Sequence, residues 1–459
     1  MSAQATPIAT GEEERYRRKT AASGRFFVEA RQYMPGGDSR STLFYPPYPA
    51  VMERGEGCRL VDLDGNSLLD FTGNHSVLIH GYAHPVVMEA IEGQLRKGTC
   101  FPGSSEPQLE FARLICQRIP SVERIRFTNS GTEASLNAIR AARAFSGRKK
   151  IAKVEGGYHG TADDVMVSIH PAATEAGQRA RPRATAHAKG LPPEIMGNVV
   201  IVPFNDVDAA RQVIEAEASE LAAVVVEPLL GSAGMIPAEQ SYLEMLRDVT
   251  QRLGILLVLD EVVSLRVAYG GAQEYFGVTP DLTIFGKMIG GGFPLGAFGG
   301  RADIMALFDP SAGRPVIPHP GSHNANPIGV VAGMATLELL TRPVLDRLNT
   351  RAEAFREDLA EAFGDAGVPV QITGLGSLFA MHLTGQPVRS YRDTIGTNTN
   401  LHHQIFLGLF NEGVLIDPRG VGNLSTVLGE DEIQQFGHAL RTVFDRIKAD
   451  RAADLTPRF

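Results

Sequence analysis

One lysine stands in the most unusual surroundings of the chain. Lys287 follows the strand-like residues 282–285 and Gly286, and glycines occupy positions 290–292. A lysine with such apolar and glycine-rich flanks is typical of a partly buried amine with a lowered pKa, the kind that forms Schiff bases. A solvated surface lysine would have more polar neighbours. A phosphate-binding loop of the G-x-x-x-x-G-K type is excluded, because Asp281 stands where its first glycine belongs.

A stretch of small hydroxyl residues is a second candidate for chemistry. Ser130-Gly131-Thr132 comes shortly after the apolar run 125–127 and opens a helical pattern. The first turn of a helix presents free N–H groups and the positive end of the helix dipole, an arrangement that favours a phosphate group. An ordinary capped helix has the same composition, so both interpretations stay open at this point.

An aromatic pair lies among glycines at residues 155–160. Tyr158-His159 has two glycines before it and one after it. This pattern indicates a loop that holds a ring against a flat ligand, and it is equally typical of a simple surface turn.

Carboxylates follow two further apolar runs. Glu227 comes directly after residues 222–226, and Asp260-Glu261 follow residues 255–259. Carboxylates at strand ends are common helix caps, so each is weak evidence alone. Their value is that the ends of parallel strands converge on one cleft.

Two arginines occupy turn-like segments. Arg40 lies in the segment 35–41, and Arg419 lies in Asp417-Pro418-Arg419-Gly420. An arginine in such a loop either binds a carboxylate with two parallel hydrogen bonds or is merely exposed. Three histidines lie near one another in the sequence, His75, His80 and His84, but they lack carboxylate or cysteine support. We therefore predict no metal site.

The elements that must position these residues form a strand–helix–strand pattern. Short apolar runs recur at 125–127, 151–154, 199–202, 222–226, 255–259 and 282–285. Between two of them, residues 241–253 repeat apolar side chains at helical spacing and end at Gly254, a typical C-terminal cap. Strands that alternate with helices predict a mainly parallel sheet with helices on both faces.

Composition narrows the class of protein. The chain has 459 residues, of which 43% are hydrophobic and 21% charged, so it can bury a sizeable core in one large and one smaller domain. A net charge of −8 argues against a nucleic-acid or polybasic membrane protein. Three scattered cysteines and the lack of an apolar signal core predict a cytoplasmic location, with no membrane span.

Five motifs occur in the order that is characteristic of one family. They are Ser130-Gly131-Thr132-Glu133-Ala134, Gly157-Tyr158-His159-Gly160, Asp260-Glu261-Val262, Gly286-Lys287, and Gly321-Ser322 with Asn326-Pro327. Together they resemble the class III aminotransferases, pyridoxal-phosphate enzymes of fold type I, over about residues 25–445. The closest resemblance is to the glutamate-1-semialdehyde aminomutase group, which includes β-amino acid aminotransferases such as the β-phenylalanine enzymes.

The resemblance implies a fold and its domains. It implies an α/β large domain with a mainly parallel sheet, which binds pyridoxal phosphate, at residues 79–335. A smaller α+β domain is built from the N-terminal residues 1–78 and the C-terminal residues 336–459. The family assembles as homodimers, so a homodimer is implied as well.

The resemblance also implies roles for the central residues. Lys287 forms the Schiff base to the cofactor and moves the proton between substrate and cofactor. Asp260 pairs with the protonated pyridine nitrogen, so that the ring stays an electron sink. Tyr158 stacks on one face of the ring, and Val262 packs against the other.

The phosphate contacts follow from the same comparison of motifs. Gly131 and Thr132, with Ser130 beside them, hold the phosphate. Ser322 reaches it from the second subunit of the dimer. Relatives usually have Thr at this position, and Ser keeps the hydroxyl donor.

The departures lie in the substrate region. β-Amino acid aminotransferases have Pro-Arg-Gly at the place of Arg419 and Ser-Arg-Ser at the place of Arg40, whereas aminomutases differ around Arg419. Ornithine-type members have Glu where this chain has Ser232. The chain is therefore predicted to be an aminotransferase that moves an amino group from a β-amino acid or amine to a 2-oxo acid by a ping-pong cycle. Arg40 and Arg419 are then the substrate-binding residues.

Two rival functions remain. One is a glutamate-1-semialdehyde 2,1-aminomutase, in which the amino group migrates within one molecule. The other is a pyridoxal-phosphate carrier or regulatory protein without turnover, which the presence of both Lys287 and Asp260 disfavours.

Overall fold

A seven-stranded sheet forms the centre of the molecule in the computed structural model, which describes residues 11–311 and 313–454. Its order is β4-β14-β13-β12-β9-β5-β8. The strands in that order are β4 (Arg124–Thr128), β14 (Gly296–Gly300), β13 (Leu282–Phe285), β12 (Leu256–Asp260), β9 (Leu221–Val226), β5 (Lys150–Val154) and β8 (Val199–Val202). From β13 to β8 all neighbours are parallel, which confirms the predicted α/β fold with a mainly parallel sheet.

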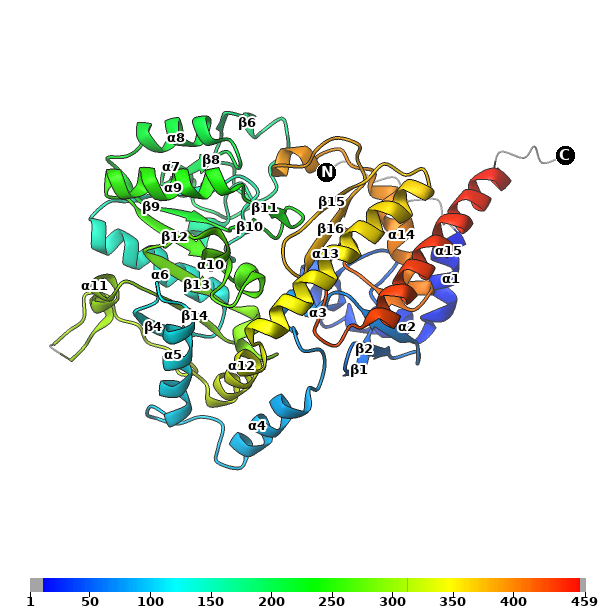
Figure 1. The fold of residues 1–459 in the computed structure, drawn as a ribbon, viewed down its shortest axis with the longest axis horizontal. Coiled ribbons are helices and arrows are strands. Elements are labelled where there is room, and N and C mark those ends of the chain that lie inside the picture. The colour runs from blue at the N-terminus through cyan, green and yellow to red at the C-terminus, as the bar shows by residue number, and fades with distance from the viewer. Residues whose placement is uncertain (1–10, 312, 455–459) are drawn as a thin grey trace.

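Helices cover both faces of this sheet (Figure 1). On one face, Val224 and Leu257 pack with α8 (Val207–Ala216) and α9 (Gln240–Leu253). On the other, the alternate residues Val225 and Val258 pack with α6 (Gly131–Ser146). Burial on both faces explains why these strands read as continuous apolar runs. The predicted helix 241–253 is confirmed as α9, and Gly254 has the left-handed φ of +62° that ends it.

The sequence analysis did not predict β14, because three of its five residues are glycine and glycine is poorly suited to strands. Its neighbours explain the composition. A Cβ at Gly296 would lie 2.2 Å from the carbonyl oxygen of Ser130, and one at Gly300 would lie 2.2 Å from that of Asp281. Backbone packing this close excludes any side chain. The strand forms in spite of its low propensity because β13 pairs with it on one side and β4 on the other.

Segments from the two ends of the chain build the second part of the fold. One sheet has the order β1 (Met52–Glu56), β2 (Arg59–Asp62), β3 (Ser67–Asp70) and β17 (Val414–Leu415), and β17 runs parallel to β3. A second sheet contains β15 (Gln371–Thr373), β16 (Leu378–His382) and β18 (Val421–Asn423). The helices around them include α1 (Gly11–Lys19), α13 (Arg342–Asp365), α14 (Thr399–Asn411) and α15 (Glu430–Asp454). The exact domain boundaries stay a prediction.

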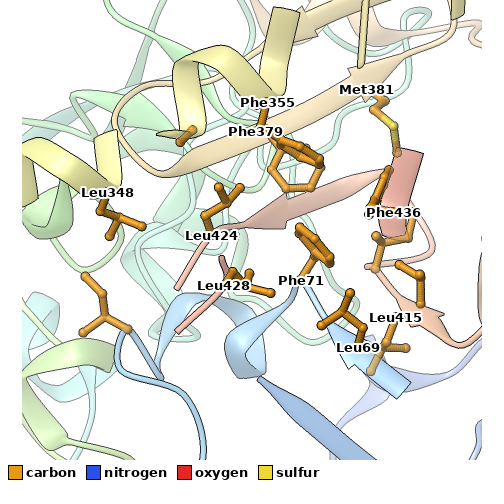
Figure 2. Close-up of a cluster of buried hydrophobic side chains, with 14 of the residues drawn as sticks. Leu69, Phe71, Leu348, Phe355, Phe379, Met381, Leu415, Leu424, Leu428 and Phe436 are labelled. Atoms are coloured by element: carbon orange, nitrogen blue, oxygen red, sulfur yellow. The ribbon is translucent and has the colours of Figure 1, made fainter. Parts of the chain in front are cut away.

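Aromatic side chains hold these distant segments together (Figure 2). The ring of Phe71, which follows β3, stacks on Phe355 of α13 at 5.4 Å between ring centroids. Phe436 of α15 approaches Phe71 edge-on at 4.8 Å. All three rings are buried, so each adds both apolar burial and a favourable ring geometry.

Within the described residues, no single helix is long and apolar enough to cross a bilayer. By length and composition, only the described pair of α12 (Pro327–Leu339) and α13, with a 75° bend between them, passes that test.

The turn that carries Lys287 packs against a buried helix. This 3₁₀ turn, η5 (Lys287–Gly290), contacts α12 (Pro327–Leu339). A Cβ on Gly333 of α12 would lie only 1.8 Å from the carbonyl oxygen of Ile289. The helix therefore supports the turn by direct backbone contact, which only glycine permits.

We expect Gly333→Ala to lower the stability of the protein by about 1–3 kcal/mol, the usual cost of overpacking a core. Gly93→Ala is the matched control, since Gly93 is an exposed residue of α4 (Pro85–Leu95) with nothing within 4 Å of its added Cβ. That change should be neutral or stabilise by up to about 1 kcal/mol. Thermal unfolding of both variants measures the difference, and equal melting temperatures would contradict the contact.

Candidate active site

A cavity of about 370 Å³ opens at the carboxyl ends of the parallel strands. Most of the residues that the sequence singles out line it: Ser130, Gly131, Thr132, Tyr158, Asp260, Val262, Lys287 and Arg419. Among the described residues that form its walls, Arg40 and Ser322 do not appear. The convergence of strand ends is the reason that residues far apart in sequence meet here.

Lys287 enters the cavity from the first residue of η5, directly after β13 and Gly286. Its φ of +49° is left-handed, a conformation that costs energy in a residue with a side chain and that clusters at functional sites. Burial lowers the pKa of its ammonium group, and the nearby carboxylates of Glu227 and Asp260 partly oppose this effect. The amine is consequently easier to deprotonate, and so more nucleophilic, than an ordinary lysine.

Asp260 is the last residue of β12 and is buried. Its Oδ1 accepts a hydrogen bond from the N–H of Val262 at 3.0 Å. Its Oδ2 lies 2.8 Å from Nδ1 of His159, which must be the donor because a carboxylate only accepts. Burial lowers the pKa of His159, so a neutral ring that donates from Nδ1 fits the pair. Each oxygen of Asp260 is thus held in place by a different neighbour.

The N-terminus of α6 forms one wall. Ser130 caps the helix, with its Oγ accepting a hydrogen bond from the N–H of Glu133 at 3.2 Å. Gly131 and Thr132 follow as the first helical residues, whose N–H groups have no partner within a helix. The stretch is therefore a capped helix whose N-terminal end lines the cavity, and its contact with a phosphate stays a prediction.

Tyr158 and Val262 are the apolar groups next to these polar ones. Tyr158 is 42% exposed and lines the cavity. Val262 packs between two glycines: a Cβ on Gly131 or on Gly286 would lie 3.2 or 3.3 Å from its methyl groups. The valine therefore occupies the space that the missing side chains leave, between the helix end and the lysine turn.

Glu227 follows β9 and is buried at the cavity wall. Its Oε2 accepts a hydrogen bond from the N–H of Tyr158 at 2.8 Å, and its Oε1 accepts one from Gly231 at 3.2 Å. Burial raises the pKa of this carboxyl group to about 8, with a further contribution from Asp260. The two N–H donors work in the opposite direction, because they stabilise the ionised form.

Arg419 lines the cavity with its own counter-ion. Its side chain is 51% exposed, and its Nε and Nη2 donate to the two oxygens of Asp417 at 2.9 and 3.1 Å. The carboxylate of Asp417 is almost fully buried and lies 3.6 Å from Nδ1 of His75.

Arg40 is exposed, and its Nη1 donates to Oδ1 of Asn74 at 2.9 Å. Asn74 and His75 are adjacent residues of the turn α3 (Gly73–Ser76), in which all four residues have φ between +49° and +69°. Arg40 therefore contacts this strained turn directly, and Arg419 is linked to it through Asp417.

Ser322 is exposed and lies away from this cavity in the described chain. Its carbonyl oxygen accepts a weak hydrogen bond from Sγ of Cys100 at 3.7 Å. Its predicted contact across a dimer stays a prediction. Among the described residues, no group of three or more His, Cys, Asp or Glu side chains can hold a metal ion.

The sequence analysis gave no role to His159, although it stands beside Tyr158. Its histidine–carboxylate pair joins residues 101 positions apart, so no local pattern reveals it. Within the described residues, its Nε2 is buried and has no hydrogen-bond partner.

Comparisons with known proteins agree with this geometry. The model of the family "Aminotransferase class-III" matches residues 44–431. The chain is 39% identical over 429 residues to a β-phenylalanine transaminase of Variovorax paradoxus, which covers 93% of this chain and 94% of that one. It is also 39% identical over 397 residues to a glutamate-1-semialdehyde 2,1-aminomutase of Methanothermobacter thermautotrophicus, covering 86% and 92%.

A solved structure gives the same result. The crystal structure of an omega-transaminase from Sphaerobacter thermophilus superposes with a TM-score of 0.91 at 42% identity, covering 94% of this chain and 99% of that one. The chain therefore belongs to the class III aminotransferases, the pyridoxal-phosphate-dependent transaminases of fold type I.

Proposed function

We propose that this transaminase takes an amino group from a β-amino acid and gives it to a 2-oxo acid in a ping-pong cycle, as a cytoplasmic homodimer. The observation that carries the proposal is the cavity that joins an amine and a buried carboxylate, Lys287 and Asp260, with Arg419 on its wall. Arg40 approaches the neighbouring turn α3. The likeness to a β-phenylalanine transaminase over nearly the whole chain supports the donor class.

The residues of the cavity fit pyridoxal phosphate. The open N-terminus of α6 at Gly131 and Thr132 suits its phosphate. The carboxylate of Asp260 suits the protonated ring nitrogen, and the amine of Lys287 suits its aldehyde. When bound, this cofactor withdraws electrons from the substrate carbon that bears the amino group.

Each residue then has a defined task. Lys287 holds the proton that leaves the substrate carbon and returns it at Nζ, which its lowered pKa favours. Asp260 keeps the ring nitrogen charged, and its fixed orientation comes from Val262 and His159. Tyr158 and Val262 confine the ring between them, and Ser322 reaches the phosphate from the partner subunit.

The two arginines choose the substrates. In a β-amino acid the carboxylate lies one carbon further from the reacting amine than in an α-amino acid, so one fixed arginine cannot serve both substrates. We assign Arg40 to the β-amino acid carboxylate and Arg419 to the α-carboxylate of the 2-oxo acid. The position of Ser232 agrees with this division, because its hydroxyl lies 3.1 Å from Nε2 of His170 and supplies no carboxylate to pair with an arginine.

Glutamate-1-semialdehyde 2,1-aminomutase is the second candidate, and the 39% identity to the Methanothermobacter protein favours it. The two functions differ in stoichiometry. A transaminase requires a separate acceptor for every turnover, whereas an aminomutase converts one substrate without any. Incubation with a panel of β-amino acids plus 2-oxoglutarate, and separately with glutamate-1-semialdehyde alone, decides between them.

We expect Lys287→Ala to fold and to bind pyridoxal phosphate, because the phosphate and ring contacts come from other residues. Its turnover should fall by more than about 10⁴-fold, since both the nucleophilic amine and the proton carrier are lost. Lys150→Ala is the control, because Lys150 pairs with Glu217 and Glu220 at the far end of β5. Steady-state kinetics and the visible spectrum measure both variants, and wild-type turnover in Lys287→Ala would disprove its role.

We expect Asp260→Asn to lower kcat by at least ~10²-fold, because a neutral amide no longer stabilises the charged ring nitrogen. Asp281→Asn is the matched control. Asp281 is also buried and ion-paired, to Arg247 and Arg301, but it precedes β13 at the opposite edge of the sheet. The Asp281→Asn variant should be less stable than the wild type and should keep its kcat. Unchanged kinetics in Asp260→Asn would mean that another carboxylate, such as Glu227, holds the ring nitrogen.

We expect the two arginine variants to have opposite effects. Arg40→Ala should raise KM for a 3-amino-3-aryl or 3-aminoalkanoic acid more than KM for 2-oxoglutarate, and Arg419→Ala should do the reverse. Each lost bidentate contact should change KM by about 10- to 100-fold. Measurement of the two half-reactions separately tests the assignment, and equal effects on both would overturn it.

A further inference from the structure

A second lysine, which the proposed chemistry does not use, lies beneath the active-site loop. Lys153 belongs to β5, where its neighbours Ile151, Ala152 and Val154 are buried and apolar. Its own side chain is fully buried as well. A buried ammonium group is costly unless hydrogen bonds satisfy it, so its contacts must compensate for the lost water.

Those contacts are two backbone carbonyl groups. Nζ of Lys153 donates to the oxygen of Gly157 at 2.8 Å and to the oxygen of Val167 at 2.6 Å. The first carbonyl belongs to the peptide group that joins Gly157 to Tyr158.

The other end of the same peptide group meets an acidic side chain. The N–H of Tyr158 donates to Oε2 of Glu227 at 2.8 Å. The peptide group therefore lies between Lys153 and Glu227, with its carbonyl oxygen towards the amine and its N–H towards the carboxyl group. Both ends of its dipole have a buried polar partner.

We propose that Lys153 and Glu227 form a buried clamp on the peptide group between Gly157 and Tyr158, and that Lys153 is a positioning residue which holds the Tyr158 ring against the cofactor. The clamp fixes the backbone of Tyr158 from both sides. It also gives each of two buried titratable side chains a hydrogen-bond partner in the backbone. The inference rests on the proposed contact of Tyr158 with pyridoxal phosphate.

The surrounding loop supports the clamp. The N–H of Gly156 donates to the carbonyl oxygen of Ser168 at 3.0 Å, and the ring of His159 is held by Asp260. The loop at residues 156–159 is thus held on each side of the clamped peptide group. The orientation of that peptide plane then determines the direction in which the Tyr158 side chain leaves the backbone.

The test is a double-mutant cycle read by cofactor affinity. We expect Lys153→Met to weaken pyridoxal-phosphate binding by about three- to tenfold, the size of one aromatic contact. In a Tyr158→Ala background the same change should weaken binding less than twofold, because the positioned ring is already absent. Equilibrium dialysis of the full-length chain measures affinity, and visible circular dichroism of the bound cofactor reports the orientation of its ring.

Glu227→Gln repeats the cycle from the other end of the peptide group and carries the test if Lys153→Met does not fold. Arg118→Met is the matched control for the loss of a buried cation. Arg118 is 3% exposed and donates to the carbonyl oxygens of Tyr269, Leu337 and Leu340, outside the cavity. It should lower the melting temperature and leave both the cofactor affinity and the visible circular dichroism unchanged.

The outcomes separate this inference from the proposed function. Equal penalties with and without the Tyr158 ring, or a cofactor loss in Arg118→Met as large as in Lys153→Met, would overturn the clamp and leave the transaminase assignment intact. If Tyr158→Ala alone leaves cofactor affinity unchanged, the proposed ring contact fails and the clamp fails with it.

Discussion

Burial of titratable side chains at the carboxyl edge of the central sheet is the constraint on which the active site depends, because it shifts each of them towards its neutral form. Burial lowers the pKa of Lys287 and raises that of Glu227 to about 8. The same burial lowers the pKa of Lys153 to about 7. The nearby carboxyl groups partly oppose the shifts of the two lysines, and backbone groups complete the hydrogen bonds of Lys153 and Glu227. The result at Lys287 is an amine that gives up its proton readily within a folded core.

Close backbone contacts at two glycines determine the positions of these buried side chains. The turn η5, which carries Lys287, contacts α12 at Gly333, and the start of α6 contacts β14 at Gly296. A methyl group at either position would move the backbone that carries Lys287 or Ser130. Side chains can adapt to one another more easily than two backbones in contact, so these glycines fix the positions of the segments that carry Lys287 and Ser130.

The second part of the fold brings Arg419 to the wall of the cavity. β17, which runs parallel to β3, and β18 carry the chain past Arg419 and back beside the N-terminal turn α3. That turn stays left-handed because Asp70 accepts the N–H groups of Thr72 and Gly73, and because Asn423 donates to the carbonyl of Thr72. In this turn Asn74 binds Arg40, and His75 lies next to Asp417, the partner of Arg419.

Much of this molecule was predictable from local patterns. The apolar runs of the parallel strands and the helix that ends at Gly254 were visible because their periodicity involves only near neighbours. The ordered motifs around Ser130, Asp260 and Lys287 indicated the family, its fold and its cofactor.

What the sequence alone did not reveal depends on contacts between distant residues. β14 forms because β13 and β4 pair with it on both sides, and His159 matters because it meets Asp260. The pair of Arg419 and Asp417 is local, but its place at the cavity comes from the fold. Local sequence determines most of the elements, whereas contacts across the whole chain decide which buried side chains share one cavity, because residues far apart in sequence meet only in the folded protein.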